Sequence, residues 1–474
     1  MSQQAVAPTP GAALDPQLKR IAAAVITGAI AVILDTTIVS VAIHELGSEL
    51  DASVSTIQWV STAYLLAMFV AIPVTGWAQS RVGAKRLWLM ALTLFLVGSV
   101  LCALAWNVES LIAFRVVQGL GGGVMMPLMT TILMQAAHGQ NVGRLMAAVS
   151  LPAALGPILG PVIGGLILNY LSWEWLFLVN VPLCLVGLYL AVRLLPADRD
   201  AVRPVPLDVV GMLLVSPGVV AVIYGLANVG GEGGFGRADV IAPLVIGLVL
   251  LAAFAAWSVH AGERALVDVR LFRHRALTSS SALLFLAGLG LYGSMLLLPL
   301  YWQEVRGQDA LGAGLLLIAQ GVGALGSRSL AGRLTDTIGG RWVAVGGFAV
   351  LAVATVPFAF ATPTTSETFL MAALFVRGLG FGAVTIPLMT GAYFGLERDE
   401  IPHASIITRV AMQLGGSFGV AVLAVILASN AAGATSLAGI AEAFDVAFWW
   451  AIGFTVLAVG LSFLLPAKPA RVEA

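Results

Sequence analysis

The segment GWAQSRVGAKR at residues 76–86 decides the fold, because a similar segment, GRLTDTIGGRW, recurs at residues 332–342. In each copy two glycines stand seven positions apart and are followed by basic residues. Each copy also lies between two long apolar stretches. A second pair follows in the same order: QGLGGGVMMPLMT begins at Gln118 and RGLGFGAVTIPLMT begins at Arg377. The chain therefore contains an internal repeat that spans several apolar stretches in each copy.

The composition is that of an integral membrane protein. The 474 residues are 59% hydrophobic and 10% charged, with a mean hydropathy of +0.98, whereas soluble domains carry about 25% charged residues. The 24 basic and 24 acidic residues balance, which gives no argument for nucleic acid as a partner. Cys102 and Cys184 lie in apolar runs and are expected to be buried small hydrophobes. No histidines have metal-ligand spacing, so we expect neither a metal nor another cofactor.

A helix that crosses a membrane needs about 20 apolar residues. We predict fourteen such helices, near residues 19–44, 56–79, 86–106, 109–136, 142–168, 172–195, 207–228, 239–260, 276–302, 309–334, 341–361, 366–393, 402–430 and 445–466.

The distribution of Lys and Arg predicts the orientation of these helices. If the N-terminus lies in the cytosol, nearly all basic residues near helix ends fall on the cytosolic side, and only Arg237 and Arg306 fall outside. This asymmetry agrees with the positive-inside rule. The sequence thus predicts a multi-pass protein of the cytoplasmic (inner) membrane with both termini in the cytosol.

The two copies of the repeat have the same order and the same predicted orientation, as in transporters built from two parallel six-helix halves. The spacing between the copies exceeds one such half by about two helices. The predicted organisation is a cytosolic tail at 1–18, a six-helix bundle at 19–200, two extra transmembrane helices at 201–262, a second six-helix bundle at 263–466 and a cytosolic tail at 467–474.

Four further segments carry a family resemblance: LDTTIVSVAI at 34–43, RVVQGLGGG at 115–123, GPILGPVIGG at 156–165 and WEWLFLVNVP at 173–182. With the loop repeat, they resemble the major facilitator superfamily, specifically its fourteen-helix drug:proton antiporter family. The resemblance covers nearly the whole chain. It implies an all-α membrane fold with two pseudo-symmetric halves in a 6+2+6 arrangement.

The segment GPILGPVIGG places helix breakers inside a predicted helix. Gly156, Gly160 and Gly164 share one helix face, and Pro157 and Pro161 form an adjacent stripe. Small residues four apart let two membrane helices approach closely, and membrane helices tolerate proline. The motif ends at Gly165. In the resembling family it marks antiporters, and it is proposed to seal the path between the two halves or to act as a hinge. Tight helix packing without hinge motion is the alternative.

Asp35 is the most informative single residue. A carboxylate near the middle of a membrane helix costs about 2.5–3.5 kcal/mol, and Thr36 and Thr37 can hydrogen-bond it but not neutralise it. A carboxylate that exchanges its proton with one side or the other can couple transport to a proton gradient, and the resemblance places a functional acidic residue here. The alternative is a structural partner for a buried arginine.

Arg115 is the obvious partner of Asp35, because it remains charged and must face the protein interior. Gln118 lies three residues further on, on nearly the same face. The resemblance implies that Arg115 influences proton release from the carboxylate, and a static ion pair between two helices is the alternative. Arg377 aligns with Gln118 rather than with Arg115, so we do not transfer the role to it.

In resembling proteins an Asp midway through the loop motif locks the two halves together on the cytosolic side. Asp336 fills that place in the second copy, but Ser80 fills it in the first. The alternative function of these loops is to anchor the helix ends as positive-inside charges. The candidate gating residues are Gly76, Arg81, Gly83, Lys85, Arg86, Gly332, Arg333, Asp336, Gly339 and Arg341.

Met and aromatic side chains make adaptable surfaces that accept several ligand shapes. The candidate residues of a substrate cavity between the halves are Gln58, Tyr64, Gln118, Met125, Met126, Phe285, Tyr292 and Phe381. With few charges in the membrane, a lipophilic compound, including a cationic one, fits better than a sugar or a phosphate.

We therefore expect a monomeric, proton-coupled exporter of lipophilic drugs or toxic compounds, with protons and the lipid bilayer as its other partners. It is not expected to be an enzyme, since no nucleophile, base and orienting acid fall together, and GLGGGV lacks the following Lys-Ser/Thr of a nucleotide-binding loop. The alternatives are an exporter of one endogenous metabolite or lipid, and a membrane-embedded sensor that does not transport.

Overall fold

The computed structural model describes residues 15–52, 54–137, 145, 160, 163–198, 206–230, 234–308, 310–397, 399–432 and 436–466. The helices are α1 (Pro16–Val41), α2 (Ile43–Glu49), α3 (Val54–Val82), α4 (Ala84–Ala103), α5 (Val108–Ala137), α7 (Trp175–Leu178), α8 (Asn180–Leu194), α9 (Val209–Ala227), α10 (Ala238–Ala261), α11 (Arg275–Leu300), α12 (Ala310–Ile338), α13 (Gly340–Thr355), α14 (Glu367–Ala392), α15 (Ile401–Ala431) and α16 (Leu437–Ser462). Residues 163–170 are also helical.

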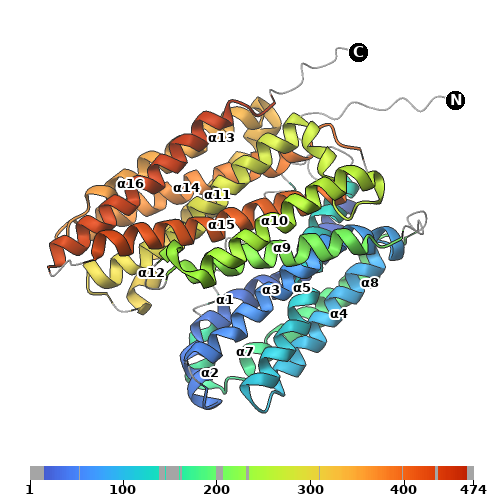
Figure 1. Ribbon diagram of the computed structural model, residues 1–474, viewed down its shortest axis with the longest axis horizontal. Helices are drawn as coiled ribbons and strands as arrows, with labels where there is room; N and C mark the ends of the chain where they lie inside the picture. The colour runs from blue at the N-terminus through green and yellow to red at the C-terminus, as the bar shows by residue number, and fades with distance from the viewer. Residues whose placement is uncertain are drawn as a thin grey trace.

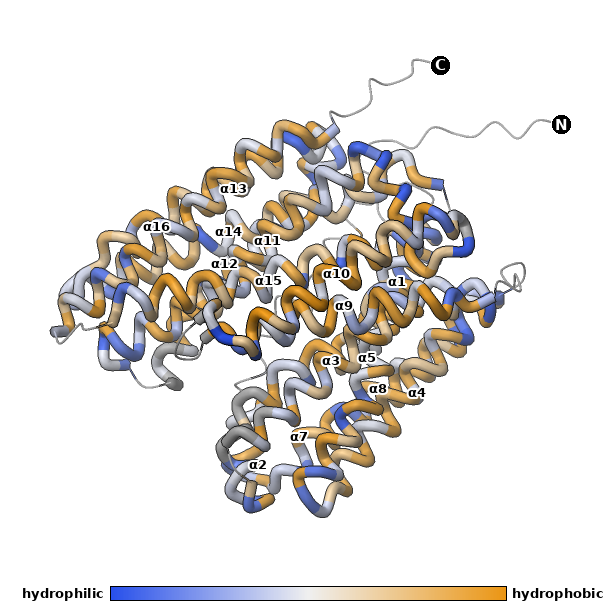
Figure 2. The backbone as a smooth tube through the Cα atoms, viewed as in Figure 1, coloured by the Kyte–Doolittle hydropathy of each residue, from blue (hydrophilic) through white to orange (hydrophobic). Residues whose placement is uncertain are grey.

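Within the described ranges, 13 helices are long and apolar enough to cross a membrane. Most agree with the predicted spans to within a few residues. Most of the expected helix at 142–168 lies outside the described residues, so the full count and the 6+2+6 division stay predictions. Figure 2 shows that hydrophilic residues gather at the two ends of the helices and hydrophobic residues between them, as a bilayer requires.

The last helix begins earlier than the sequence suggested. The predicted span started at residue 445, whereas α16 begins at Leu437 and so also includes Glu442 and Asp445. The Ser436 hydroxyl accepts a hydrogen bond from the backbone N–H of Gly439 and so caps this helix. Both carboxylates therefore lie within the first turns of a membrane helix.

Two groups of helices form the molecule (Figure 1). In the first, α5 packs between α3 and α4, and α8 packs against α1 and α4. In the second, α14 packs between α12 and α13, while α11 packs against α15 and α16. The repeated glycines explain the matching arrangement. A Cβ on Gly121 would lie 2.7 Å from the backbone nitrogen of Phe95, and one on the matching Gly380 would lie 2.7 Å from that of Leu351, so larger residues would push these helices apart.

The extra pair, α9 and α10, bridges the two groups. The helices α9 and α10 pack on each other, and α9 also packs against α3 of the first group and α15 of the second. The buried carboxylate of Asp208 fixes the pair: it caps α9 at Gly211 and accepts hydrogen bonds from Trp257 Nε1 (2.8 Å) and the Leu266 backbone N–H (3.0 Å). Within the described structure, the pair is thus attached to both sides of the boundary between the groups.

The two groups meet near the end that carries both chain termini and diverge toward the opposite end (Figure 1). Near the terminal end the hydroxyls of Thr131 on α5 and Ser405 on α15 lie 2.9 Å apart. A Cβ on Gly76 of α3 would lie 3.5 Å from Cδ1 of Ile406. The described structure is therefore closed at the terminal end and splayed at the other.

Candidate functional site

Asp35 lies in the interior of the first helix group. It stands six residues before the end of α1, about 9 Å along the helix axis from the end opposite the termini. Its side chain is 0% exposed. Three groups donate hydrogen bonds to its carboxylate: Arg115 at 2.6 Å, Gln118 Nε2 at 2.9 Å and Asn180 Nδ2 at 3.0 Å. The carboxylate is thus both neutralised and fully hydrogen-bonded.

Arg115 is equally enclosed, with 1% of its side chain exposed. Its Nε donates to the carbonyl of Val60 on α3 at 3.0 Å, and one terminal nitrogen donates to Gln118 Oε1 at 2.6 Å as well as to Asp35. Its guanidinium lies over the ring of Tyr64, 3.9 Å from the ring centroid, which adds a cation–π interaction. The pair is therefore held by α1, α3, α5 and α8 together.

Gln118 connects this pair to α4. Its amide nitrogen donates to Ser99 Oγ at 2.8 Å as well as to Asp35, and the Cys102 thiol lies 3.7 Å from its amide oxygen. The sequence placed Asp35, Arg115 and Gln118 as candidates, and the structure brings all three together. Their roles in proton coupling stay predictions.

Sequence reasoning missed Asn180 and Ser99, which are both 0% exposed. Each is a lone polar residue inside an apolar stretch, which is the signal that could have found them, because such residues need partners in a membrane. Thr36 and Thr37 do not reach Asp35, however. Their hydroxyls donate back to carbonyls of α1, at Ile33 and Leu34 respectively.

Of the GPILGPVIGG segment, Gly156, Pro157 and Pro161 lie outside the described residues. Gly160 and Gly164 face α1 just beyond Asp35: a Cβ on Gly160 would lie 2.5 Å from Cβ of Thr37, and one on Gly164 would lie 3.3 Å from the carbonyl oxygen of Ile38. Gly165 has open space around it. The small residues thus allow a close approach to α1, which fits both tight packing and the predicted hinge.

The first loop motif has a carboxylate despite Ser80. Asp198, which follows α8, accepts hydrogen bonds from the backbone N–H groups of Lys85 (3.0 Å) and Arg86 (3.1 Å) at the start of α4. Gly83 has φ +93°, and a Cβ there would collide with Asp198. The Lys85 ammonium donates to the carbonyls of Val192 and Leu195. This loop is therefore tied to the end of α8 within its own helix group.

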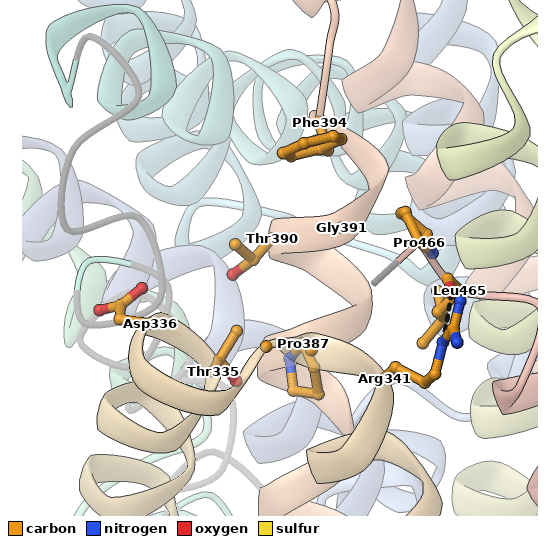
Figure 3. Close-up of a pocket in the computed structure, with 11 residues that line it drawn as sticks. Thr335, Asp336, Arg341, Pro387, Thr390, Gly391, Phe394, Leu465 and Pro466 are labelled. Carbon is orange, nitrogen blue, oxygen red and sulfur yellow. Dashed lines mark hydrogen bonds between the residues drawn. The ribbon is translucent and has the colours of Figure 1, made fainter. Parts of the chain in front are cut away.

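The second loop motif has the same backbone turn, with φ +93° at Gly339. Arg341 Nε donates to the carbonyl of Leu465 at 2.7 Å, in the manner of Lys85. A cavity of about 140 Å³ opens beside it, and Figure 3 shows Asp336 and Arg341 on opposite sides of this cavity. Gly332 and Arg333 belong to the last turns of α12, and Arg81 lies over the Trp77 ring at 5.9 Å. Gating by these loops stays a prediction.

Most of the predicted cavity residues are packed inside the helix groups. Tyr64 and Gln118 belong to the ion-pair cluster, and the side chains of Met125, Met126 and Phe381 are buried between helices. All five are almost fully buried in the described structure, and their role in a substrate cavity stays a prediction. The side chain of Gln58 lies outside the described residues. Phe285 and Tyr292 on α11 are half-buried against α15 and remain candidates.

Arg377 on α14 forms a second buried cluster. It donates to Gln320 Oε1 at 2.6 Å, to Thr355 Oγ1 at 3.1 Å and to the Ser294 hydroxyl. The partners that it contacts in the described structure are all neutral, in contrast to Arg115. The two helix groups thus share a fold but not the charge arrangement of the site.

Comparisons with known proteins agree with this architecture. The family model of the Major Facilitator Superfamily matches residues 25–420. The "Multidrug resistance protein B homolog" of Mycobacterium tuberculosis strain H37Rv is 36% identical over 416 residues, which cover 87% of this chain and 77% of that protein. The "Multidrug export protein EmrB" of Haemophilus influenzae is 32% identical over 389 residues, which cover 82% of this chain and 76% of that protein.

Two solved structures share the fold. A double-tryptophan mutant of XylE superimposes with a TM-score of 0.67 at 16% identity, covering 96% of this chain and 97% of that one. The human organic anion transporter MFSD10 superimposes with a TM-score of 0.65 at 15% identity, covering 94% of this chain and 100% of that one. At these identities the likeness concerns the fold alone. Because the family model covers most of its length, this chain belongs to the major facilitator superfamily of membrane transporters.

Proposed function

We propose that this protein is a proton-coupled antiporter that exports lipophilic drugs or other toxic compounds across the cytoplasmic membrane by alternating access. Relatives that cover most of the chain are named multidrug resistance or multidrug export proteins. The observation that carries the coupling is the Asp35–Arg115 pair, sealed inside the first helix group.

The pair supplies a physical reason for coupling. While Asp35 is ionised, it compensates the buried charge of Arg115. Protonation of Asp35 would leave that charge uncompensated, at a cost of several kcal/mol in a low-dielectric interior. The penalty would favour a different arrangement of α1 and α5, so the bound proton would bias the equilibrium between the two access states. The described state, splayed at the end opposite the termini, corresponds in this scheme to the outward-open one.

The basic residues near the terminal end support a cytosolic location of both termini. We further propose that the chain works as a monomer of two six-helix halves, 19–200 and 263–466, with the extra helices of 201–262 beside the boundary between the halves. In this scheme the protein moves its substrate without covalent chemistry.

Efflux from proteoliposomes with an imposed proton gradient tests the proposal. A fluorescent lipophilic cation such as ethidium serves as the substrate, and Asp35→Asn is compared with Asp239→Asn. Asp239 is a matched control because it is half-exposed and forms only a surface pair with Arg237. We expect gradient-driven efflux to fall at least about tenfold in Asp35→Asn and to persist in Asp239→Asn. Undiminished gradient-driven efflux in Asp35→Asn would show that another residue couples transport to the proton gradient. If the wild-type protein exports no tested cation, the alternative of a membrane-embedded sensor is favoured.

A further inference from the structure

The helix α15 carries a polar stripe that faces the first helix group. Ser405, Arg409 and Gln413 stand four residues apart and therefore share one helix face. Ser405 meets Thr131 of α5 at the closed end. Arg409 and Gln413 follow one and two turns further from the terminal end, and both are half-buried rather than sealed. They therefore lie just beyond the contact that closes the molecule, on the splayed side.

No carboxylate of the described residues forms an ion pair with Arg409. This arginine stands about 12 Å into α15 from the start of the helix. The segment 138–162, which is mostly undescribed, contains no Asp or Glu that could pair with it. The carboxylate of Asp35 is already occupied by Arg115. An arginine in this setting stays charged and favours an anionic ligand.

Tyr64 places this charge close to the ion-pair cluster. Its side chain is 1% exposed, and its hydroxyl has no hydrogen-bond partner among the described residues. One face of its ring covers the Arg115 guanidinium. The charge of Arg409 also acts on the Tyr64 hydroxyl from the other helix group. Tyr64 thus contacts the Arg115 cation directly and also experiences the charge of Arg409.

An aromatic wall borders the same stripe. Gly416 lies seven residues after Arg409, on the same face, and a Cβ there would lie 3.0 Å from Cγ of Tyr292 on α11. The Tyr292 ring therefore packs against α15 at Gly416, one turn beyond Gln413. The combination of a cation, an amide and an aromatic ring suits an aromatic compound that carries a negative group.

We propose that Arg409, with Gln413 and Tyr292, forms a subsite for the anionic group of an aromatic substrate, such as a carboxylate. This inference rests on the proposed export function and extends its substrate class from lipophilic cations to anionic and zwitterionic compounds. Arg409 binds the carboxylate, Gln413 donates a further hydrogen bond, and Tyr292 packs against the aromatic body. Occupation of the subsite from the splayed side places the substrate beside Tyr64.

A pair of dyes that differ only in a carboxylate tests the subsite. Rhodamine B carries a free carboxylate, and its ethyl ester does not. Binding of each dye to the purified full-length protein is measured by fluorescence anisotropy for the wild type, Arg409→Gln, Arg409→Lys and the exposed control Arg237→Gln. We expect the Kd of the acid to rise at least about tenfold in Arg409→Gln, with a smaller rise in Arg409→Lys. The Kd of the ester should stay within about twofold.

Equal losses for both dyes in Arg409→Gln, or no loss for the acid, would overturn the subsite. A wild-type protein that shows no preference for the acid would do the same. Size-exclusion chromatography first establishes that Arg409→Gln is folded, and for a misfolded variant the same outcomes are judged on Arg409→Lys instead. Binding needs no proton gradient, so the two proposals can fail separately. Charge-selective binding without gradient-driven efflux would reject only the export function. Gradient-driven efflux without charge-selective binding would reject only the subsite.

Discussion

A single ion pair dominates the chemistry at the scale of residues. Asp35 and Arg115 are both almost completely buried, and four neighbouring groups hydrogen-bond or stack on them: Val60, Tyr64, Gln118 and Asn180. Ser99 in turn accepts a hydrogen bond from Gln118. A buried pair contributes little net stability compared with an apolar replacement, but removing one member leaves an unpaired charge. A small net contribution to stability agrees with the proposed coupling role of the pair.

A double-mutant cycle checks this interpretation. We expect Arg115→Met to lower the free energy of unfolding by about 3–5 kcal/mol, because Asp35 is left buried and unpaired. The double variant Asp35→Leu/Arg115→Met should be clearly more stable than Arg115→Met. Thermal unfolding in detergent measures the difference in each background. Additive effects of the two substitutions would mean that the residues do not interact.

At the scale of elements, each loop motif forms its described hydrogen bonds within its own helix group. Asp198 caps the N-terminus of α4, and Lys85 and Arg341 each donate to carbonyls at the end of the last helix of their group. The sequence motif alone suggested a lock between the halves. That lock stays a prediction, and the described structure shows how each loop is fixed to the helix that ends beside it.

The cap can be tested by substitution. Asp198→Ala removes both acceptors from the backbone N–H groups of Lys85 and Arg86, so we expect the protein to lose about 0.5–2 kcal/mol of stability. Asp239→Ala is the control, because its exposed pair with Arg237 contributes little. Thermal unfolding of both variants in one detergent compares them. Equal melting temperatures of Asp198→Ala and Asp239→Ala would show that the Asp198 cap does not stabilise the protein.

At the scale of the whole molecule, the described state is closed near the termini and splayed at the other end. The Thr131–Ser405 contact belongs to the closed end, and the 2.9 Å between the two hydroxyl oxygens shows that the side chains point at each other, which makes these positions suitable for a cross-linking test with cysteines. The native Cys102 and Cys184 are both buried and give little background reaction.

We therefore expect Thr131→Cys/Ser405→Cys to form an intramolecular disulfide under mild oxidation and to lose efflux, because the closed end can no longer open. Reduction should restore the efflux, and either single variant should be insensitive to oxidant. A cross-linked protein that still exports would show that this contact is not part of the gate.

The single variant Arg237→Cys tests the orientation of the chain. A membrane-impermeant maleimide added from outside the cell should label this cysteine only if the two termini are cytosolic.

The sequence by itself determined the membrane class, most helix boundaries, the repeat and the candidates Asp35, Arg115 and Gln118. These follow from hydropathy, glycine spacing and the cost of charge in a bilayer, which are all local properties of the chain. Only the tertiary structure decided which side chains meet, because contacts between distant helices depend on their rotation and depth. It brought Asn180 and Asp198 to their partners, enclosed Tyr64 and Met125, and left Arg409 without a carboxylate in the described structure.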